Sequence, residues 1–261
     1  MCKVIAVSNQ KGGVGKTTTV VNLAAALSAR KRTVLVVDLD PQAHATLGLG
    51  LEKQQGVSLY PVLLGEKPIE DVIQPTKWNN LNVIPSEVDL AGAELEFGAR
   101  EDRLEMIRNV LAPVREAGAF DYIILDCPPS LGILSINALA ASSGVIIPMQ
   151  CEFYSLEGLS QLMASIRQVK RLYNSYLELE GVLLTMFDGR LNLTQQVVSE
   201  VKRFFPQKVY ATVIPRNVRL SEAPSFGQPV FYYDKSSKGS VAYGEFTKEF
   251  LKKNGRRPKE K

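Results

Sequence analysis

The chain contains 261 residues, of which 45% are hydrophobic, which is enough to bury the core of one large α/β domain. Its formal net charge of +4 comes from one end: residues 248–261 contain seven Lys or Arg against two Asp or Glu, and the rest of the chain contains 24 against 25. A generally basic surface for binding nucleic acid is therefore excluded for the body of the chain, and any DNA contact there requires a local patch.

Several other classes of protein are excluded by what the sequence lacks. No apolar run approaches the roughly 18 to 20 residues that span a bilayer, and residues 1–10 do not resemble a signal peptide, so we expect a cytoplasmic protein. Cys2, Cys127 and Cys151 form no CxxC pair, which indicates reduced thiols and neither a disulfide framework nor a zinc site. The single histidine, His44, is expected to be a surface residue.

The pattern along the chain predicts an α/β fold with a doubly wound, mostly parallel sheet. Short β-branched runs alternate with segments whose apolar residues have helical spacing, and several of these runs are apolar on both faces, as a sheet covered on both sides requires. The expected strands are 3–8, 33–38, 81–85, 122–126, 144–149, 179–185 and 209–214, and the expected helices are 17–30, 100–117, 155–173 and 193–205. We expect one domain over residues 1–252, because no long linker interrupts it, and a basic, flexible tail over residues 253–261.

A phosphate-binding loop is predicted between the first expected strand and the first expected helix. The sequence GGVGKTT follows KVIAVS and precedes a helical segment, which is the setting that such a loop requires. Glycines let backbone amides curl around phosphate oxygens, and the start of the helix adds its positive dipole end. Lys16 is expected to reach the β- and γ-phosphates, and the Thr17 hydroxyl is expected to ligate Mg²⁺. The expected nucleotide contacts are Gly12, Gly13, Val14, Gly15, Lys16, Thr17 and Thr18.

Carboxylates follow two of the expected strands, at the edge of the sheet where open α/β proteins bind ligands. The run TVLVVDLDPQ places Asp38 and Asp40 after one strand, and FDYIILDCPPS places Asp126 after another. We expect Asp126 to hold Mg²⁺ through water and Asp38 to support the magnesium shell. Asp40, which Pro41 follows, is the candidate for orienting or deprotonating the attacking water.

Four spaced motifs together resemble the ParA/Soj family of partitioning ATPases, a deviant Walker A class of P-loop NTPase related to MinD. They are KGGVGKTT, DLDPQ, DCPPSLG and TVIPRNVRLSEAPSFG, and the similarity extends from about residue 3 to residue 252. The resemblance implies a Mg²⁺-dependent ATPase, with ATP and ADP as its nucleotides. It further implies chromosome or plasmid partitioning, non-specific binding to double-stranded DNA near the nucleoid, and stimulation by a centromere-binding, ParB-like partner.

The resemblance also gives a role to a second lysine before the glycines. In this class the lysine matching Lys11 reaches across a homodimer to the phosphates bound by the partner subunit. Electrostatics favours the same arrangement, because Mg²⁺ and Lys16 neutralise only part of the roughly four negative charges of ATP, so two facing sites repel unless each subunit donates a cation. We therefore expect a homodimer that forms when ATP is bound, with Lys11 among the catalytic and nucleotide-binding residues.

Further residues are carried over by the resemblance alone. Pro215 and Asn217 match the segment that packs beside the adenine, and Arg190 and Arg219 match DNA-contacting arginines. Both arginines are equally compatible with ordinary surface charges, although other Lys and Arg residues are close to them in sequence.

Two alternatives share this core. A MinD-like ATPase of the division site attaches to membrane through an amphipathic C-terminal helix, whereas the end of this chain becomes wholly polar, so no membrane partner is expected. A pure DNA-binding protein with a vestigial nucleotide site is disfavoured, because Lys16, Thr17, Asp40 and Asp126 are all present.

Overall fold

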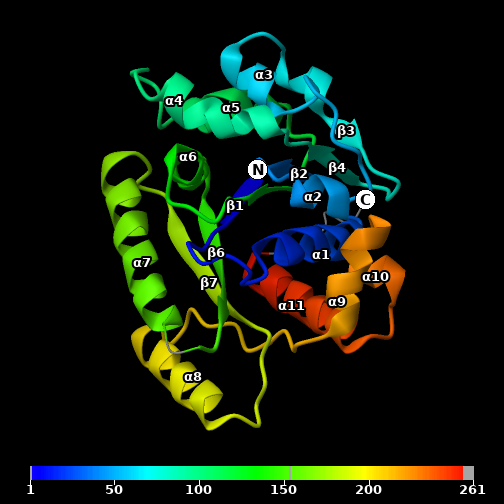
Figure 1. Cartoon of the computed structure of the whole chain (residues 1–261), viewed down its shortest axis with the longest axis vertical. Coiled ribbons are helices and arrows are strands. Elements are labelled where there is room, and N and C mark those ends of the chain that lie inside the picture. The colour runs from blue at the N-terminus through cyan, green and yellow to red at the C-terminus, as the bar shows by residue number, and fades with distance from the viewer. Residues whose placement is uncertain (1, 153, 255–261) are drawn as a thin grey trace.

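The computed structural model describes residues 2–152 and 154–254, without the side chains of residues 94 and 95. One seven-stranded sheet forms its centre, in the order β3-β4-β2-β5-β1-β6-β7 (Figure 1). All neighbouring strands are parallel except β3, which pairs antiparallel with β4 at one edge. The strands are β1 (Lys3–Val7), β2 (Val34–Asp38), β3 (Gln74–Pro75), β4 (Leu81–Ile84), β5 (Tyr122–Asp126), β6 (Gly144–Gln150) and β7 (Glu178–Thr185).

Helices cover both faces of the sheet (Figure 1). The longer ones are α1 (Lys16–Ser28), α5 (Met106–Ala117), α6 (Ile133–Ala141), α7 (Ser155–Leu172), α8 (Asn192–Phe204) and α11 (Lys238–Asn254). Short helical segments connect them: α2 (His44–Gly48), α3 (Leu59–Leu64), η1 (Ile69–Val72), η2 (Val88–Gly92), α4 (Ala93–Phe97), α9 (Val218–Glu222), η3 (Ala223–Phe226) and α10 (Val230–Tyr233).

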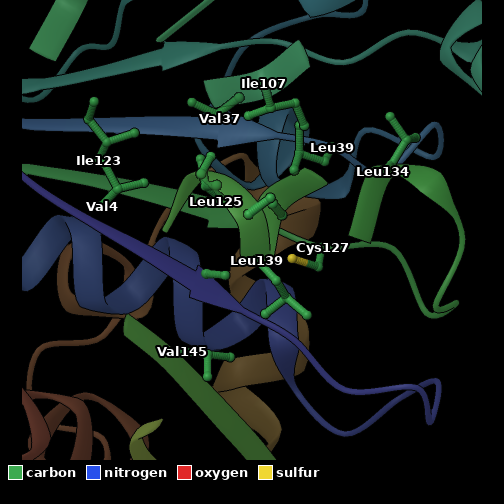
Figure 2. Close-up of a cluster of buried hydrophobic side chains, with 14 of the residues drawn as sticks. Val4, Val37, Leu39, Ile107, Ile123, Leu125, Cys127, Leu134, Leu139 and Val145 are labelled. Atoms are coloured by element: carbon green, nitrogen blue, oxygen red, sulfur yellow. The ribbon is translucent and has the colours of Figure 1, made fainter. Parts of the chain in front are cut away.

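The sheet separates two hydrophobic cores, because the side chains of each strand point alternately to its two faces. On one face, Val4, Ile123 and Leu125 pack with apolar residues of α5, α6 and α7; Figure 2 shows part of this cluster. On the other face, the strands pack against α1 and α11, whose Phe246 and Phe250 are fully buried. Every residue of β2 and β5 is buried, which explains why their sequences do not alternate and are apolar up to the aspartate that ends each strand.

Strand register brings the carboxyl ends of the central strands level with each other. Asp126 of β5 lies opposite Val7 of β1 on one side and opposite Asp38 of β2 on the other. The loop that follows β1 therefore faces two buried carboxylates. The predicted fold class is confirmed: the sheet is doubly wound and mostly parallel, and six of the expected strands form within one or two residues of their expected bounds.

Two predicted elements differ from the structure. Residues 209–214 form no strand: a single bridge joins Val209 to Val182 of β7, and the amides of Tyr210 and Ile214 donate to β7 carbonyls at 3.0 and 2.8 Å. The amides between them, of Ala211 and Thr212, donate to the Glu249 carboxylate of α11 at 2.8 and 3.0 Å and not to the sheet. The helix expected over 100–117 begins only at Met106. Its start is fixed by α6, where the Asn137 side chain accepts from the Ile107 amide at 3.2 Å.

The expected basic tail falls almost entirely outside the described residues. Helix α11 continues to Asn254, so the first two residues of the expected tail are helical. Among the described residues, no helix combines the length and the apolar character needed to cross a membrane.

Candidate nucleotide site

The loop between β1 and α1 has the backbone of a phosphate-binding loop. Gly13 and Gly15 adopt positive φ angles of 73° and 87°, a region that residues with a Cβ enter only at a cost. Gly15 is the N-cap of α1 and provides no side-chain cap, so the first amides of the helix remain free to bind an anion. The loop that the sequence predicts therefore has the conformation that phosphate binding requires.

Side chains from β6 and β7 hold this loop from behind. The Gln150 amide donates to the Gly13 carbonyl at 2.9 Å, and the Thr185 hydroxyl donates to the Val14 carbonyl at 2.8 Å. At the start of the loop, the Asn9 side chain donates to the Pro148 carbonyl at 2.7 Å. Because the bonds from Gln150 and Thr185 use carbonyls of the loop, they leave its amides available for phosphate oxygens.

Lys16 lies inside the loop and not in solvent. The residue is 7% exposed, and its ammonium group donates to the Lys11 carbonyl at 3.1 Å. Burial lowers the pKa of Lys16, while the negative charge of Asp126 opposes that shift. A buried ammonium whose acceptor is a neutral carbonyl is well placed to exchange that acceptor for a phosphate oxygen.

Asp126 is the group in the site that most clearly lacks a partner. Both carboxylate oxygens are fully buried, and neither forms a hydrogen bond with the described residues. Burial, followed by the charge of Asp38, raises the pKa of Asp126 well above its usual value, and the neighbouring Thr17 hydroxyl and Lys16 ammonium oppose this rise. Unpaired buried carboxylates are costly, so this one calls for a cation or an ordered water.

The oxygen groups around Asp126 fit Mg²⁺. A hydroxyl, a carboxylate, waters and nucleotide phosphates are the ligands that Mg²⁺ takes in such sites. Among the described residues, no cluster of three or more His, Cys, Asp or Glu side chains is arranged to hold a metal by protein ligands alone. Thr17 and Asp126 have the oxygen groups that could contribute to an ion bound mainly by nucleotide phosphates and water.

Asp38 and Asp40 occupy different environments in the loop that follows β2. Asp38 is fully buried and accepts hydrogen bonds from the amide and hydroxyl of Thr46, both at 2.8 Å, and from the Asp40 amide at 3.2 Å. Burial raises the pKa of Asp38 to about 6, and the bonds from Thr46 and Asp40 oppose the shift. Asp40 is 8% exposed and uses one carboxylate oxygen to accept from the Gln42 amide at 3.0 Å, which leaves its other oxygen for a further donor.

A cavity of about 290 Å³ adjoins the phosphate loop and contains both predicted base contacts. Gly15 and Thr18 line one side, and Pro215, Asn217 and Leu220 line the other. Asn217 also caps α9, because its side-chain oxygen accepts from the Arg219 amide at 3.1 Å. A second cavity, of about 390 Å³, lies on the other side of Thr17 and Thr18 and extends to α2 and η3.

Lys11 stands at the exposed tip of the loop. Its ammonium group forms an ion pair with the Glu152 carboxylate, in the segment that follows β6. Its backbone is fixed by its own amide, which donates to Asn9 at 3.0 Å. The two lysines of the loop therefore have separate roles in the described chain: Lys16 points into the loop, and Lys11 points away from it.

The two predicted DNA-contacting arginines lie on neighbouring segments. A bridge between Phe187 and Pro215 brings the loop that carries Arg190 beside the segment that leads to Arg219. Each guanidinium already pairs with carboxylates: Arg190 with Asp188 at 2.6 Å, and Arg219 with Glu222 at 2.7 Å and Asp234 at 3.3 Å. Both arginines are exposed, but nearby acidic side chains reduce their net charge.

A larger cavity, of about 840 Å³, lies at the opposite edge of the sheet, near the start of β1 and β5. Two of its basic side chains have partners within the chain: Arg108 donates to the Ala140 carbonyl at 2.9 Å, in the last turn of α6, and Lys3 pairs with Glu180 at 2.8 Å. Carbonyls at helix C-termini attract cations, so the place of Arg108 needs no bound anion to explain it. The predicted nucleotide contacts instead line the smaller cavity beside the phosphate loop.

Sequence reasoning missed several residues that shape the site, namely Asn9, Gln150, Thr185, Thr46 and Tyr243. Thr185 ends the expected strand 179–185 and Gln150 directly follows the expected strand 144–149, so the kind of position that indicated Asp126 was also a signal for them. Tyr243 reaches the Thr19 hydroxyl of α1 from α11, at 3.1 Å, and the local sequence gives no sign of that contact.

Known proteins share both the sequence and the fold. A family model described as an AAA domain matches residues 2–179. Chromosome partitioning protein ParA of Myxococcus xanthus is 50% identical over 254 residues, which are 97% of this chain and 89% of that protein. Sporulation initiation inhibitor protein Soj of Bacillus subtilis is 53% identical over 250 residues, which are 95% of this chain and 98% of that protein.

Solved structures give the same result. The cobyrinic acid a,c-diamide synthase structure from Mycobacterium smegmatis, with bound ATP analog and magnesium, superposes with a TM-score of 0.87 at 37% identity, covering 98% of this chain and 96% of that one. The fold, the phosphate loop and the buried carboxylates thus define a magnesium-dependent P-loop ATPase that binds ATP or ADP. Within that class, the chain belongs to the ParA/Soj family, as the four motifs predict.

Proposed function

We propose that this ATPase is a switch for partitioning chromosomes or plasmids. In its ATP state it forms a homodimer that binds nucleoid DNA without sequence preference, and hydrolysis, accelerated by a ParB-like partner, releases the DNA. The relatives named as chromosome partitioning proteins support this role. The observation that carries it is the pair of lysines on one loop, one buried at the phosphate position and one exposed at the tip.

The described residues suggest how hydrolysis proceeds. Amides of the loop and Lys16 bind the phosphates, and Lys16 exchanges the Lys11 carbonyl for a phosphate oxygen. Mg²⁺, held near Thr17 and Asp126, neutralises charge on the β- and γ-phosphates when it is bound. Asp40 uses its unengaged carboxylate oxygen to orient the attacking water.

Dimer formation depends on nucleotide because Lys11 exchanges Glu152 of its own chain only for a stronger anion in the partner subunit. The γ-phosphate supplies that anion, and its loss on hydrolysis removes part of the target. The Pro215–Leu220 side of the base cavity continues into α9, which carries Arg219, so base contact and DNA contact belong to one short segment. We assign DNA binding to Arg190 and Arg219 through phosphate contacts alone, which predicts a steep dependence on salt.

We further propose that residues 1–252 act as one domain, and that the protein is cytoplasmic and associates with the nucleoid. The alternative is a MinD-like ATPase at a membrane surface. Phe246 and Phe250, whose helical spacing resembles that of a membrane-binding helix, are fully buried against the sheet. They are therefore not available for insertion, which favours DNA over a lipid surface.

One titration tests the proposal. DNA of random sequence is added to the protein with a non-hydrolysable ATP analogue, with ADP and with no nucleotide, at two salt concentrations. We expect tight binding only with the analogue, and a fall of affinity at the higher salt concentration. Equal affinity in all three nucleotide states would contradict the switch, and binding to anionic vesicles in place of DNA would favour the alternative.

A further inference from the structure

The loop that carries Asp40 is anchored by a side chain outside the predicted nucleotide motifs. Thr46, in α2, is fully buried, and its amide and hydroxyl together form three hydrogen bonds. Its amide and its hydroxyl both donate to one oxygen of Asp38 at 2.8 Å. The same hydroxyl accepts from the Ser86 amide, just after β4, at 3.1 Å. Thr46 thus connects the carboxyl ends of two neighbouring strands through a single side-chain oxygen.

Asp38 connects Thr46 to Asp40 through a further hydrogen bond. The second oxygen of Asp38 accepts from the Asp40 amide at 3.2 Å, and the Asp40 carbonyl accepts from the Ala43 amide at 2.8 Å. A chain of hydrogen bonds therefore runs from Ser86 through Thr46 and Asp38 to the backbone of Asp40. Each bond in it is buried, where hydrogen bonds are strong and missing partners are expensive.

This loop needs an anchor because its backbone is strained. Ala43, the N-cap of α2, has φ 56° and ψ 38°, a left-handed conformation that costs a residue with a Cβ about 1–2 kcal/mol. It also provides no side-chain cap for the helix. Strained residues persist where surrounding contacts determine the backbone, and Thr46 makes such contacts one turn further along.

We propose that Thr46 is a positioning residue for ATP hydrolysis, which acts through Asp38 to hold Asp40 where the attacking water binds. This inference rests on the role that we propose for Asp40. It also changes the role of Asp38: its three hydrogen bonds direct its carboxylate at the loop, and Asp126, which has no partner, remains the carboxylate for the magnesium shell.

The alternative is a buried threonine that only stabilises the fold, and the two roles predict different kinetics. If Thr46 positions Asp40, loss of the Thr46 hydroxyl lowers kcat, because a displacement of about 1 Å at the reacting centre costs up to about 100-fold in rate. It leaves nucleotide affinity nearly unchanged, since the phosphate loop is held separately by Gln150 and Thr185. If Thr46 only stabilises the fold, loss of its hydroxyl lowers the stability and leaves the kcat of the folded protein unchanged.

The experiment compares Thr46→Val, which removes the hydroxyl, with Thr46→Ser, which keeps it. Thr247→Val is the matched control, because the Thr247 hydroxyl is also buried and donates at 2.7 Å, but to the Tyr243 carbonyl within α11. Steady-state phosphate release gives kcat and KM, binding of a fluorescent ATP analogue gives the affinity, and thermal unfolding shows that each variant is folded.

We expect Thr46→Val to lose about 10- to 100-fold in kcat with little change in nucleotide affinity. Thr46→Ser should restore the rate, and Thr247→Val should lose stability but keep its rate. If Thr46→Val does not fold, Thr46→Ala replaces it. An unchanged kcat in the folded hydroxyl-free variant, or an equal loss in Thr46→Ser, would overturn the inference.

Asp40→Ala separates this inference from the role on which it rests. If Asp40→Ala hydrolyses ATP at the normal rate, the proposed role of Asp40 fails and the positioning role of Thr46 fails with it. If Asp40→Ala is inactive while Thr46→Val remains fully active, only the role of Thr46 is overturned.

Discussion

The ammonium group of Lys11 forms an ion pair with the carboxylate of Glu152 within the same chain. This contact occupies the cation that we expect to reach the nucleotide of the partner subunit. Both side chains are partly exposed, at 41% and 50%, so the pair contributes no more than about 1 kcal/mol. The ion pair therefore restrains the Lys11 side chain only weakly, and a triphosphate in a partner subunit competes readily with Glu152.

Glu152→Gln removes the intramolecular partner of Lys11 and should make the dimer form more easily. We expect the midpoint of dimerisation with a non-hydrolysable ATP analogue to move to lower nucleotide concentration by up to about fivefold, the equivalent of about 1 kcal/mol. Light scattering coupled to gel filtration measures this midpoint. Lys11→Ala should remain monomeric at every nucleotide concentration.

Glu178→Gln is the control for this change, because Glu178 pairs with Lys170 in an equally exposed position away from the phosphate loop. It should dimerise like the unmodified protein. A dimer of Lys11→Ala with the ATP analogue would disprove the role of Lys11 across the interface. A midpoint for Glu152→Gln equal to that of Glu178→Gln would show that the ion pair does not restrain Lys11.

Asp126→Asn should abolish magnesium-dependent hydrolysis and at the same time stabilise the nucleotide-free protein. The carboxylate is buried without a hydrogen-bond partner, and an unsatisfied buried group costs about 1–3 kcal/mol or more when charged. Replacing it with a neutral amide of the same shape reduces that cost. Calorimetry without nucleotide measures the stability, and phosphate release measures the activity.

Asp121→Asn provides the matched comparison, because Asp121 lies just before strand β5 and Asp126 ends that strand. Asp121 precedes β5 and accepts from the Thr33 amide at 2.9 Å and from its hydroxyl at 3.3 Å. We expect this variant to lose stability, by about 1–2 kcal/mol, and to keep its ATPase activity. The assignment of Asp126 to the cation would be wrong if Asp126→Asn hydrolysed ATP normally with Mg²⁺.

Much of this site was predictable because local sequence determines it. The phosphate loop needs glycines at positive φ between a strand and a helix, and GGVGKTT has them in that setting. Asp38 and Asp126 were predictable as neighbours because parallel strands end at the same edge of the sheet, and their register places them opposite each other. The prediction that Pro215 and Asn217 contact the base came from the family resemblance alone, and both residues line the cavity beside the loop.

The errors have long-range causes. Residues 209–214 have strand-like composition, but the amides of Ala211 and Thr212 donate to Glu249, which is 37 residues from Thr212, and not to a neighbouring strand. Helix α5 begins late because Asn137 binds the Ile107 amide from another helix. The bonds between Thr46, Asp38 and Ser86 join positions up to 40 residues apart. No local pattern of apolar and polar residues indicates such side-chain contacts.

Asp38 should give the nucleotide-free protein a distinct dependence on pH. Its pKa in the folded chain is raised from the ordinary value of 3.8 to about 6 by burial, so the folded state binds a proton more tightly than the unfolded state. Its contribution to stability is therefore fully present below about pH 4 and is lost as the pH rises through about 6. The loss is on the order of 2–3 kcal/mol for a shift of this size.

Asp38→Asn removes this titration. We expect the difference in unfolding free energy between the unmodified protein and Asp38→Asn to change between pH 4 and 6.5 and to be flat above that range. Urea unfolding at a series of pH values without nucleotide measures it. A difference that is constant from pH 4 to 7 would show that Asp38 titrates in the folded chain as it does in the unfolded one.

Arg219 should bind DNA more strongly when its acidic neighbours are removed. Its guanidinium pairs with Glu222 and Asp234, so a DNA phosphate must displace carboxylates that already hold it. We expect Glu222→Gln to raise the affinity for random-sequence DNA in the ATP state. Arg219→Glu should weaken it and lower the slope of log affinity against log salt by about one.

The control for charge alone is Arg100→Glu. Arg100 is also exposed and paired with a carboxylate, that of Asp102 at 2.8 Å, in the turn that follows α4. Because the change in net charge is the same as in Arg219→Glu, a general electrostatic effect would weaken DNA binding equally in both variants. A local phosphate contact instead makes the salt slope fall only for Arg219→Glu, since only that variant loses a cation at the interface. Equal slopes in the two variants, or an unchanged affinity in Glu222→Gln, would show that the DNA contact does not lie on α9.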